Sequence, residues 1–397
     1  MPIIKQAVIL AGGRGARLGS LTKNRPKPMV LVNGKPFLEY LIELLKSNGI
    51  KEIILLLGYL PDKIVEYFGD GSGFGLRIKY SMGEVSDETG TRIRNARSLL
   101  ADNFLLMYCD NYWPLRLDKL ADLYEKMGLL ALATVYNNKD GSGEYGFENN
   151  MHIDNQNHVL VYDRTRKDPH LNTIEIGSFI LNKGVIDKMP DNNFSFETEI
   201  LPMLVKNNEL VAFRTDHPYY SITNPEFLKR TEKFLMSKKV VFLDRDGVIN
   251  KKMPEHDYVK SWEEFEFLPG SIEAIRTLNE NRYEIYVITN QPGIARNMMS
   301  REDLDFIHRN MLKELQKGGA NVGGIYCCLH GWDDGCECRK PSPGLLFQAA
   351  REHHIDLTEA TFIGDDERDA QAASNAGCKF EYVTTEKPLV DIVNQLV

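Results

Sequence analysis

The hydrophobic and polar positions follow the same pattern in two separate stretches of the chain. Each stretch begins with a short apolar run that ends in a polar or glycine-rich turn, QAVILAGGRGARLG from Gln6 and KKVVFLDRDGVIN from Lys238. Behind each turn, segments with helical spacing of apolar residues alternate with short apolar runs typical of buried strands. This alternation predicts two doubly wound α/β domains, each with its chemistry at the carboxyl ends of the strands.

The boundary between the two predicted domains falls after the helical segment PEFLKRTEKFL. We therefore assign residues 1–236 to the first domain and residues 237–397 to the second. The expected helices are 37–49, 60–69, 270–282 and 301–319, and the expected strands include 51–59, 76–82, 283–291 and 321–329.

Composition and charge narrow the classes of partner. The chain has 397 residues, 43% of them hydrophobic, and a net charge of -8, which gives no reason to expect a nucleic acid or a membrane as partner. The first residues lack the cleavage site of a signal peptide, and six cysteines, four of them bunched, do not form a secreted disulfide framework. We expect a cytoplasmic protein, and the sequence leaves open whether it forms a homo-oligomer.

The first turn concentrates glycines and positive charges. Gly12, Gly13 and Gly15 allow backbone N–H groups to approach an anion. The spacing G-G-x-G-x-R and the RPKPM that follows differ from a dinucleotide-binding fingerprint, so the turn predicts a triphosphate site. Its cations are Arg14, Arg17, Lys23, Arg25 and Lys27.

The segment LAGGRGARLGSLTKNRPKPMVLVNGKPFLEYLIELL resembles the signature of the sugar-1-phosphate nucleotidylyltransferases. The resemblance implies that the glycine loop and Arg17 hold the triphosphate and that Lys27 offsets charge at the reacting phosphate. Asp110, which ends LLMYCD, would bind Mg²⁺, and Glu197 would lie near the sugar. The sugar phosphate would attack the α-phosphorus and release pyrophosphate, with positioning and electrostatics supplying most of the catalysis.

Two departures from that family pattern leave the base and the metal site open. The first half is most similar to heptose-1-phosphate guanylyltransferases, which favours GTP. Arg92 stands where a small residue is common, and family members that use CTP carry an arginine in a similar segment. Ser221 replaces an aspartate that usually completes the metal site, so a metal would bind loosely, use Asp216 or depend on phosphate oxygens. A non-catalytic nucleotide-binding domain is therefore an alternative.

Four predicted strand ends in the second half carry carboxylates, a hydroxyl and a lysine. Two carboxylates as close as Asp244 and Asp246 repel each other unless a cation relieves them. The set as a whole resembles the active site of the haloacid-dehalogenase superfamily of phosphatases, over residues 238–397. Its members in this sequence are Asp244, Asp246, Thr289, Asn290, Lys340 and Asp365.

This resemblance implies a covalent mechanism. Asp244 would attack phosphorus and form an aspartyl phosphate, while Asp246 would protonate the leaving group and then activate water. Mg²⁺ would be held by Asp244, Asp365 and the backbone carbonyl of Asp246. The substrate phosphate would be gripped by Thr289, Asn290, Arg339 and Lys340.

Finer motifs indicate the substrate class. NQPGIAR and CRKPSPGL are most similar to the heptose-1,7-bisphosphate 7-phosphatases, with histidinol-phosphate phosphatases as the alternative. Asp366 occupies a position where these families commonly carry a lysine, which would add negative charge beside the magnesium.

The segment CCLHGWDDGCECRKP predicts a zinc site. Three thiolates and one imidazole form a tetrahedral set and leave no open position, so the zinc would be structural and would fix Arg339 and Lys340 over the phosphate. Cys327 would be the spare cysteine. The ligands would be Cys328, His330, Cys336 and Cys338.

The two halves together predict a bifunctional enzyme of nucleotide-sugar synthesis. The second domain would remove the 7-phosphate of a heptose 1,7-bisphosphate, and the first would transfer NMP to the resulting sugar 1-phosphate. Mg²⁺ would serve both domains. The remaining alternatives are a CTP-dependent cytidylyltransferase of another sugar or polyol phosphate fused to a phosphatase, and a histidinol-phosphate-like phosphatase with a nucleotide-binding domain.

Overall fold

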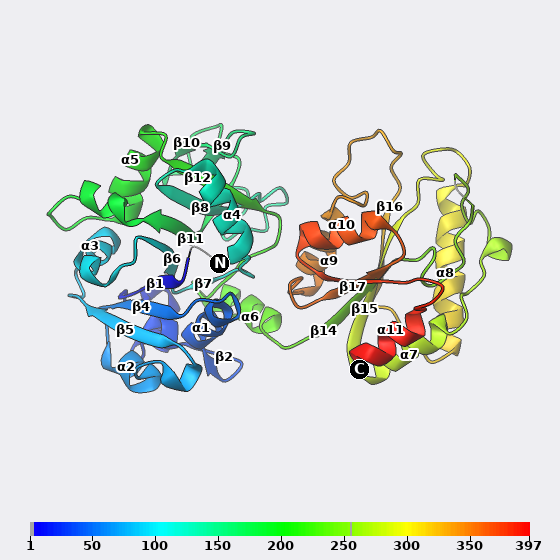
Figure 1. Cartoon of the computed structure of the whole chain (residues 1–397), viewed down its shortest axis with the longest axis horizontal. Coiled ribbons are helices and arrows are strands. Elements are labelled where there is room, and N and C mark those ends of the chain that lie inside the picture. Colours follow the sequence, from blue (N-terminus) through cyan, green and yellow to red (C-terminus); the bar gives the residue numbers. More distant parts are fainter. Residues whose placement is uncertain (1–3, 255) are drawn as a thin grey trace. The chain divides into compact units, whose positions relative to one another are not determined.

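The computed structural model (Figure 1) describes residues 4–254 and 256–397, and the chain divides into two units, Met1–Met236 and Ser237–Val397. Both units are α/β, as the alternating pattern predicts. None of the helices within the described ranges combines the length and the apolar character needed to cross a membrane.

The first unit is built on a seven-stranded mixed sheet of order β12-β8-β11-β6-β1-β4-β5. Its strands are β1 (Gln6–Ala11), β4 (Glu52–Leu57), β5 (Arg77–Met82), β6 (Asn103–Tyr108), β8 (Ala131–Tyr136), β11 (Ile174–Asn182) and β12 (Leu210–Thr215). Short pairs are formed by β2 (Leu31–Val32) with β3 (Lys35–Pro36), β7 (Asn111–Tyr112) with β13 (Tyr220–Ser221), and β9 (Met151–Ile153) with β10 (Val159–Tyr162). The helices are α1 (Phe37–Ser47), α2 (Asp62–Phe68), α3 (Thr89–Asn95), α4 (Leu117–Met127), α5 (Leu201–Lys206) and α6 (Pro225–Phe234).

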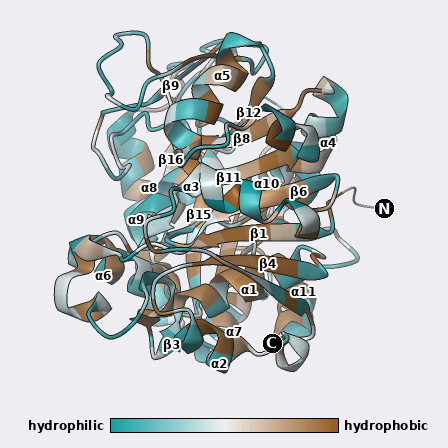
Figure 2. Cartoon of the chain, turned by 90° about the vertical axis from the view of Figure 1, so that its left-hand side faces the viewer, coloured by the Kyte–Doolittle hydropathy of each residue, from teal (hydrophilic) through white to brown (hydrophobic). Residues whose placement is uncertain are grey.

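The sheet of the first unit is mixed because β11 runs antiparallel to both of its neighbours, β6 and β8. Side chains of β1 alternate between two cores, with Ile9 on one face and Val8 on the other. The apolar strands β1 and β4 are brown in Figure 2. Helices α1, α2, α4 and α6 cover the first face, while α3 and α5 cover the second.

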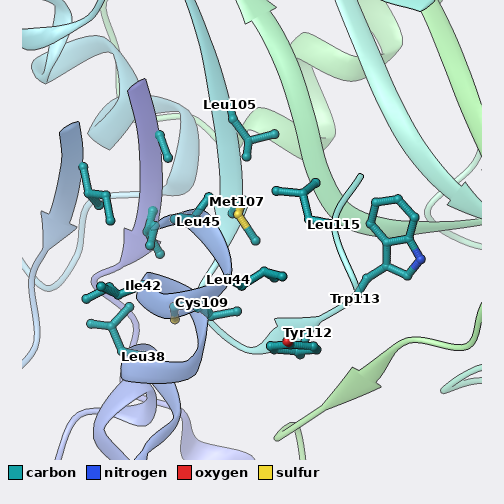
Figure 3. Packing of buried hydrophobic residues seen from close by; sticks show 14 of the residues in the cluster. Leu38, Ile42, Leu44, Leu45, Leu105, Met107, Cys109, Tyr112, Trp113 and Leu115 are labelled. Carbon is teal, nitrogen blue, oxygen red and sulfur yellow. The ribbon is translucent and has the colours of Figure 1, made fainter. Parts of the chain in front are cut away.

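Helix α1 anchors the strand that leads to the predicted magnesium aspartate. Its apolar positions Leu38, Ile42 and Leu45 recur at helical spacing and pack in one cluster with Met107 of β6 (Figure 3). Cys109 lies in the same cluster, directly before Asp110. The end of β6 is therefore fixed by buried packing on this side.

The second unit has a five-stranded parallel sheet of order β16-β15-β14-β17-β18. In that order the strands are Gly324–Cys328, Tyr283–Asn290, Lys239–Leu243, Thr361–Gly364 and Lys379–Tyr382. Helices α7 (Ser271–Glu280), α8 (Arg301–Lys317) and α11 (Leu389–Leu396) cover one face, and α9 (Gly344–His353) and α10 (Glu367–Ala376) cover the other (Figure 1). The carboxyl ends of the parallel strands meet at one edge.

Candidate functional sites

The glycine loop after β1 runs closely over two cationic side chains. Gly15 has φ 65°, in the left-handed region, and a Cβ there would lie 2.7 Å from the Cβ of Lys27. A Cβ on Gly12 would lie 2.4 Å from Cζ of Arg92. Glycine is therefore required at both positions for the loop to keep this path, whereas a Cβ on Gly13 would meet no described atom within 4 Å.

Arg92 supports the glycine loop from behind. Its guanidinium donates to the carbonyl oxygens of Leu57 at 2.7 Å and Glu84 at 2.6 Å, and the residue is buried. Burial lowers the pKa of this guanidinium, although the carboxylates of Asp87 and Glu88 counteract it. These backbone contacts give Arg92 a supporting role, while the expected contact with a nucleobase remains a prediction.

Lys27 and Asp110 form the central ion pair of the first unit. Lys27 is buried, and its Nζ contacts Oδ2 of Asp110. The backbone of Asp110 is held in turn by the N–H of Ile222, which donates to its carbonyl oxygen at 3.0 Å. The structure thus brings together the predicted lysine and the predicted magnesium ligand, which are far apart in sequence.

A second ion pair joins the glycine loop to a carboxylate that sequence reasoning missed. Nη1 of Arg17 lies 3.5 Å from Oε1 of Glu144, whose side chain is only 12% exposed. Thr223 donates to Oε2 of Glu144 at 3.2 Å. Burial and the nearby charge of Asp110 raise the pKa of Glu144. Arg14 is exposed, with its Cζ 5.7 Å from the ring centroid of Tyr59.

Glu197 lies in the helical turn Phe196–Ile200 and accepts three short hydrogen bonds. The donors are the hydroxyls of Thr89 at 2.6 Å, Tyr108 at 2.5 Å and Ser195 at 2.6 Å. A carboxylate held in this way has a fixed orientation. The contact of Glu197 with the sugar, which the sequence resemblance implies, remains a prediction.

The two residues considered as substitutes at the metal site lie in different surroundings. Ser221 is 1% exposed, and its Oγ has no hydrogen-bond partner within the described part of the chain. Asp216 accepts a hydrogen bond from Asn137 at 3.0 Å and lies 3.9 Å from Nζ of Lys139. Asp216, which follows β12, is therefore engaged with residues of the loop after β8.

The second unit contains a cavity of about 680 Å³ at the carboxyl edge of its sheet. Residues from four predicted strand ends line it, together with side chains of residues 252–254 and 256–259 and of the cysteine-rich loop. Predicted residues in its lining are Asp244, Asp246, Thr289, Asn290, Arg339 and Lys340.

Lys340 is the cation at the centre of this cavity. Its Nζ lies 2.8 Å from Oδ1 of Asp244 and 2.7 Å from Oδ1 of Asp369. Burial raises the pKa of Asp244 to about 7, against the lowering effect of Lys340. The side-chain amide of Asn290 donates to the Lys340 carbonyl and accepts from its N–H, both at 3.1 Å, so Asn290 fixes the backbone of this lysine.

Asp246 is held away from Asp244 by an arginine that we did not single out. Arg245 is fully buried and donates to both carboxylate oxygens of Asp246, at 2.9 and 3.0 Å. Gln291 adds a donor at 2.7 Å. Burial alone would raise the pKa of Asp246, but Arg245 holds it below its usual value. His308 lies 3.1 Å from Arg245, and burial lowers its pKa to about 3, so it accepts from the guanidinium as a neutral ring.

Three carboxylates form a candidate magnesium site. Oxygen atoms of Asp244, Asp365 and Asp369 lie within 4.8 Å of one another. Oδ1 of Asp365 is buried without a hydrogen-bond partner, and Oδ2 accepts from Nζ of Lys252 at 2.7 Å. Hard oxygen donors and an unsatisfied buried oxygen fit Mg²⁺. Asp369, in the first turn of α10, was not predicted as a ligand.

The cysteine-rich loop brings its four predicted ligands together. The Sγ of Cys328 lies 3.7 Å from that of Cys336 and 3.4 Å from that of Cys338, and Nδ1 of His330 lies 3.2 Å from Sγ of Cys338. A tetrahedron with zinc–sulfur bonds of about 2.3 Å has sulfur–sulfur edges of about 3.8 Å, so the cluster fits zinc. Cys327 lies outside the cluster.

The same loop directs aromatic and cationic side chains into the cavity. Cζ of Arg339 lies 5.4 Å from the ring centroid of Trp332, and Nη1 donates to the carbonyl of His330 at 3.4 Å.

The charge of Asp366 is offset locally, because Arg368 donates to its two oxygens at 2.8 and 2.9 Å. This pairing holds the pKa of Asp366 well below its usual range.

Comparisons with known proteins agree with the geometry of the first unit. The nucleotidyl transferase family model matches residues 6–220, which is more than half of the chain. Among solved structures, HddC from Yersinia pseudotuberculosis is 29% identical with a TM-score of 0.50, and the alignment covers 58% of this chain and 98% of that one.

The second unit is similar to characterised phosphatases. A HAD-hydrolase-like model matches residues 337–394. The D-glycero-beta-D-manno-heptose-1,7-bisphosphate 7-phosphatase of Bordetella bronchiseptica is 43% identical over 140 residues, 35% of this chain and 77% of that protein. The D-glycero-alpha-D-manno-heptose-1,7-bisphosphate 7-phosphatase of Campylobacter jejuni is 42% identical over 141 residues, 36% of this chain and 79% of the relative. The chain therefore belongs to the nucleotidyl transferase family in its first unit and to the heptose-1,7-bisphosphate 7-phosphatases of the HAD superfamily in its second.

Proposed function

We propose that this chain catalyses two successive steps of nucleotide-sugar synthesis in the cytoplasm. The second unit would hydrolyse the 7-phosphate of a heptose 1,7-bisphosphate, and the first would transfer GMP from GTP to the heptose 1-phosphate that results. One observation carries the proposal: a nucleotidyl transferase and a heptose-bisphosphate phosphatase share one chain. The product of the second activity is the sugar phosphate that the first requires.

In the phosphatase unit the chain's own residues account for each bond change. An oxygen of Asp244 attacks phosphorus, the bond from phosphorus to the sugar oxygen breaks, and Asp246 gives that oxygen its proton. Water then attacks phosphorus and Asp246 takes the proton from that water. The bond between phosphorus and the Asp244 oxygen breaks, which releases inorganic phosphate and restores the Asp244 carboxylate. Since Arg245 stabilises the ionised form of Asp246, we expect this carboxylate to take up its proton only when the substrate's negative charge arrives.

Metal ions fit the proposal at two places in this unit. Asp244, Asp365 and Asp369 would hold Mg²⁺, which supplies positive charge against the phosphate oxygens. Lys252 would exchange its contact with Asp365 for one with the substrate phosphate. Structural zinc would be held by Cys328, His330, Cys336 and Cys338, because four protein ligands complete its tetrahedral coordination and leave no position for a catalytic water.

In the transferase unit the glycine loop and its cations would hold the triphosphate. Lys27 would leave Asp110 for the reacting phosphate, and Asp110 would hold Mg²⁺ through one carboxylate. The sugar phosphate oxygen then attacks the α-phosphorus, and the bond to pyrophosphate breaks. One finding supports GTP over CTP: backbone carbonyls accept hydrogen bonds from the Arg92 guanidinium, which weakens the reason to favour cytosine and leaves the GTP expected from the sequence resemblance.

A substrate matrix tests this proposal. Pyrophosphate release is measured with each of four nucleoside triphosphates and both anomers of heptose 1-phosphate, and phosphate release with both anomers of heptose 1,7-bisphosphate and with histidinol phosphate. We expect GTP and one heptose anomer to be preferred. Tight nucleotide binding without turnover in any pair would instead assign the first unit a binding role, and a preference for histidinol phosphate would contradict the heptose assignment.

A further inference from the structure

Two ion pairs lie side by side in the transferase unit and leave no net charge between them. Lys27 pairs with Asp110, and Arg17 pairs with Glu144. Both cations follow the glycine loop, whereas the carboxylates come from the turn after β6 and from the loop after β8. A nucleoside triphosphate with its magnesium ion brings both signs of charge, so each member of the two pairs has a partner of opposite sign in that complex.

A short segment places Glu144 next to Asp110. Ile222 donates its N–H to the carbonyl of Asp110 at 3.0 Å, and the next residue, Thr223, donates its hydroxyl to Glu144 at 3.2 Å. The influence of the Asp110 charge on Glu144 agrees with this proximity. Residues 222–223 therefore hold the backbone of Asp110 and the carboxylate of Glu144 from one short segment.

Ser221 adds an independent observation at this place. Its Oγ is buried and has no hydrogen-bond partner among the described residues. Tyr220 and Ile222 both pack in the hydrophobic core, so Ser221 between them projects to the side away from that core. The unpartnered hydroxyl thus lies away from that core, two residues before Thr223, which donates to Glu144. A neutral hydroxyl replaces little of the charge that a carboxylate would offer Mg²⁺.

We propose that Glu144 is the second carboxylate ligand, with Asp110, of the Mg²⁺ ion that accompanies the nucleotide in the transferase unit. It takes the role that a carboxylate at position 221 would otherwise have. When Mg²⁺ and nucleotide bind, Arg17 and Lys27 exchange these carboxylates for phosphate oxygens, and the carboxylates turn to the metal. This inference rests on the proposed transferase function.

A simpler role for Glu144 makes a different prediction. If Glu144 only positions Arg17, its loss weakens the binding of GTP by the same factor with and without metal. If Glu144 is a metal ligand, its loss weakens the binding of Mg²⁺–GTP alone. Binding of metal-free GTP then stays the same or tightens, because a negative charge near the phosphates is gone.

The experiment measures the dissociation constant of GTP by calorimetry on the full-length chain, once with saturating Mg²⁺ and once with EDTA. No sugar phosphate is added, so no turnover is required, and metal at the phosphatase site contributes equally to all variants. The ratio of the EDTA value to the Mg²⁺ value reports the coupling between metal and nucleotide. We expect Glu144→Gln to lower this ratio by about tenfold or more, as loss of metal-site residues commonly does.

Two further variants make the result specific. Glu148→Gln removes the same charge from an exposed position on the same loop and should keep the wild-type ratio. Ser221→Asp in the Glu144→Gln background should restore the ratio, because it returns a carboxylate to the site. Glu144→Asp, which keeps the charge, should lower the ratio less, and it replaces the glutamine variant if that one melts at a lower temperature.

The outcomes separate this inference from the proposed function. An unchanged ratio in Glu144→Gln, with both constants weakened equally, overturns the ligand role and leaves the transferase proposal intact. Failure of Ser221→Asp to restore the ratio contradicts it as well. If the wild-type chain binds no GTP with Mg²⁺, the GTP-dependent function fails first, and the inference fails with it.

Discussion

The two active sites of this chain arrange their charges differently before substrate arrives. In the transferase unit each carboxylate, Asp110 and Glu144, has a cation of its own, and both cations follow the glycine loop in the chain. In the phosphatase unit Asp244, Asp365 and Asp369 converge within 4.8 Å, with Lys340 and Lys252 between and beside them. In the first site each negative charge is neutralised by one positive charge, whereas in the second site three carboxylates converge on one candidate metal position.

This difference follows from the charges that the substrate and its metal ion bring to each site. A nucleotidyl transferase obtains its metal together with a highly charged nucleotide, so a site of exchangeable ion pairs avoids unpaired charge when it is empty. A phosphatase with a covalent aspartate needs its nucleophile aimed and its metal ligands gathered beforehand. We therefore expect single substitutions to have larger effects in the second unit than in the first.

The largest effect is expected from Asp244→Asn. Loss of the nucleophile should lower phosphate release by roughly four or more orders of magnitude, since the other residues cannot form the covalent intermediate. Pyrophosphate release from GTP and heptose 1-phosphate should stay within about twofold of wild type. Asp391→Asn, an exposed carboxylate on α11, is the matched control. A fall of less than about tenfold in phosphate release would refute the role of Asp244.

Lys27→Ala should have the next largest effect. This variant lacks the positive charge that Lys27 would place beside the reacting phosphate. We therefore expect kcat of the transferase to fall by about 10²–10³-fold. The exposed Lys23→Ala, four residues earlier, should change kcat by less than threefold. Both variants are assayed for pyrophosphate release at saturating GTP. Equal losses of kcat in the two variants would mean that the net positive charge of this segment, and not the buried pair of Lys27 with Asp110, supports the transferase reaction.

Cys336→Ser tests the structural role of the metal loop. With one thiolate gone, zinc content measured by atomic absorption should fall, and phosphatase activity should decrease by about ten- to a hundredfold as Arg339 and Lys340 lose their placement. Cys378→Ser lies outside the cluster and should keep zinc. Full phosphatase activity in a zinc-free Cys336→Ser protein would show that the loop needs no metal.

The smallest effect is expected from Asp366→Asn. Asparagine also caps a helix well, so α10 should keep its start and the melting temperature should change little. The pair with Arg368 is lost, and this arginine lines the cavity. We expect KM for the bisphosphate to rise by about two- to fivefold, with kcat within about twofold. A larger effect on kcat than on KM would place Asp366 in the chemistry itself.

Most of the architecture follows from local pattern. The apolar periodicity of α1 and the runs of β1, β4, β14 and β15 are long and regular, so their type was predictable. The antiparallel β11 was not predicted, since strand direction depends on connections that a local pattern does not contain. The cysteine spacing likewise predicted a cluster that the structure brings together.

The residues that sequence reasoning missed act through contacts distant in sequence. Arg245 lies between two predicted aspartates and was given no role, yet it is the largest fully buried side chain among the described residues and donates to both oxygens of Asp246. Lys252 and Glu144 lie in irregular loops, where no periodicity marks a functional position. For Arg92 the contact with the base remains a prediction, and its hydrogen bonds to the distant backbone carbonyls of Leu57 and Glu84 were not visible in the sequence.

The central claim is that one chain performs both steps in order. It is tested most directly by incubating the full-length protein with heptose 1,7-bisphosphate, GTP and Mg²⁺ and following all phosphorus species by ³¹P NMR. We predict inorganic phosphate first, then pyrophosphate and a GDP-heptose in equal amounts. With Asp244→Asn, pyrophosphate should form only when heptose 1-phosphate is supplied. Phosphate release without pyrophosphate in the wild-type chain would contradict the account.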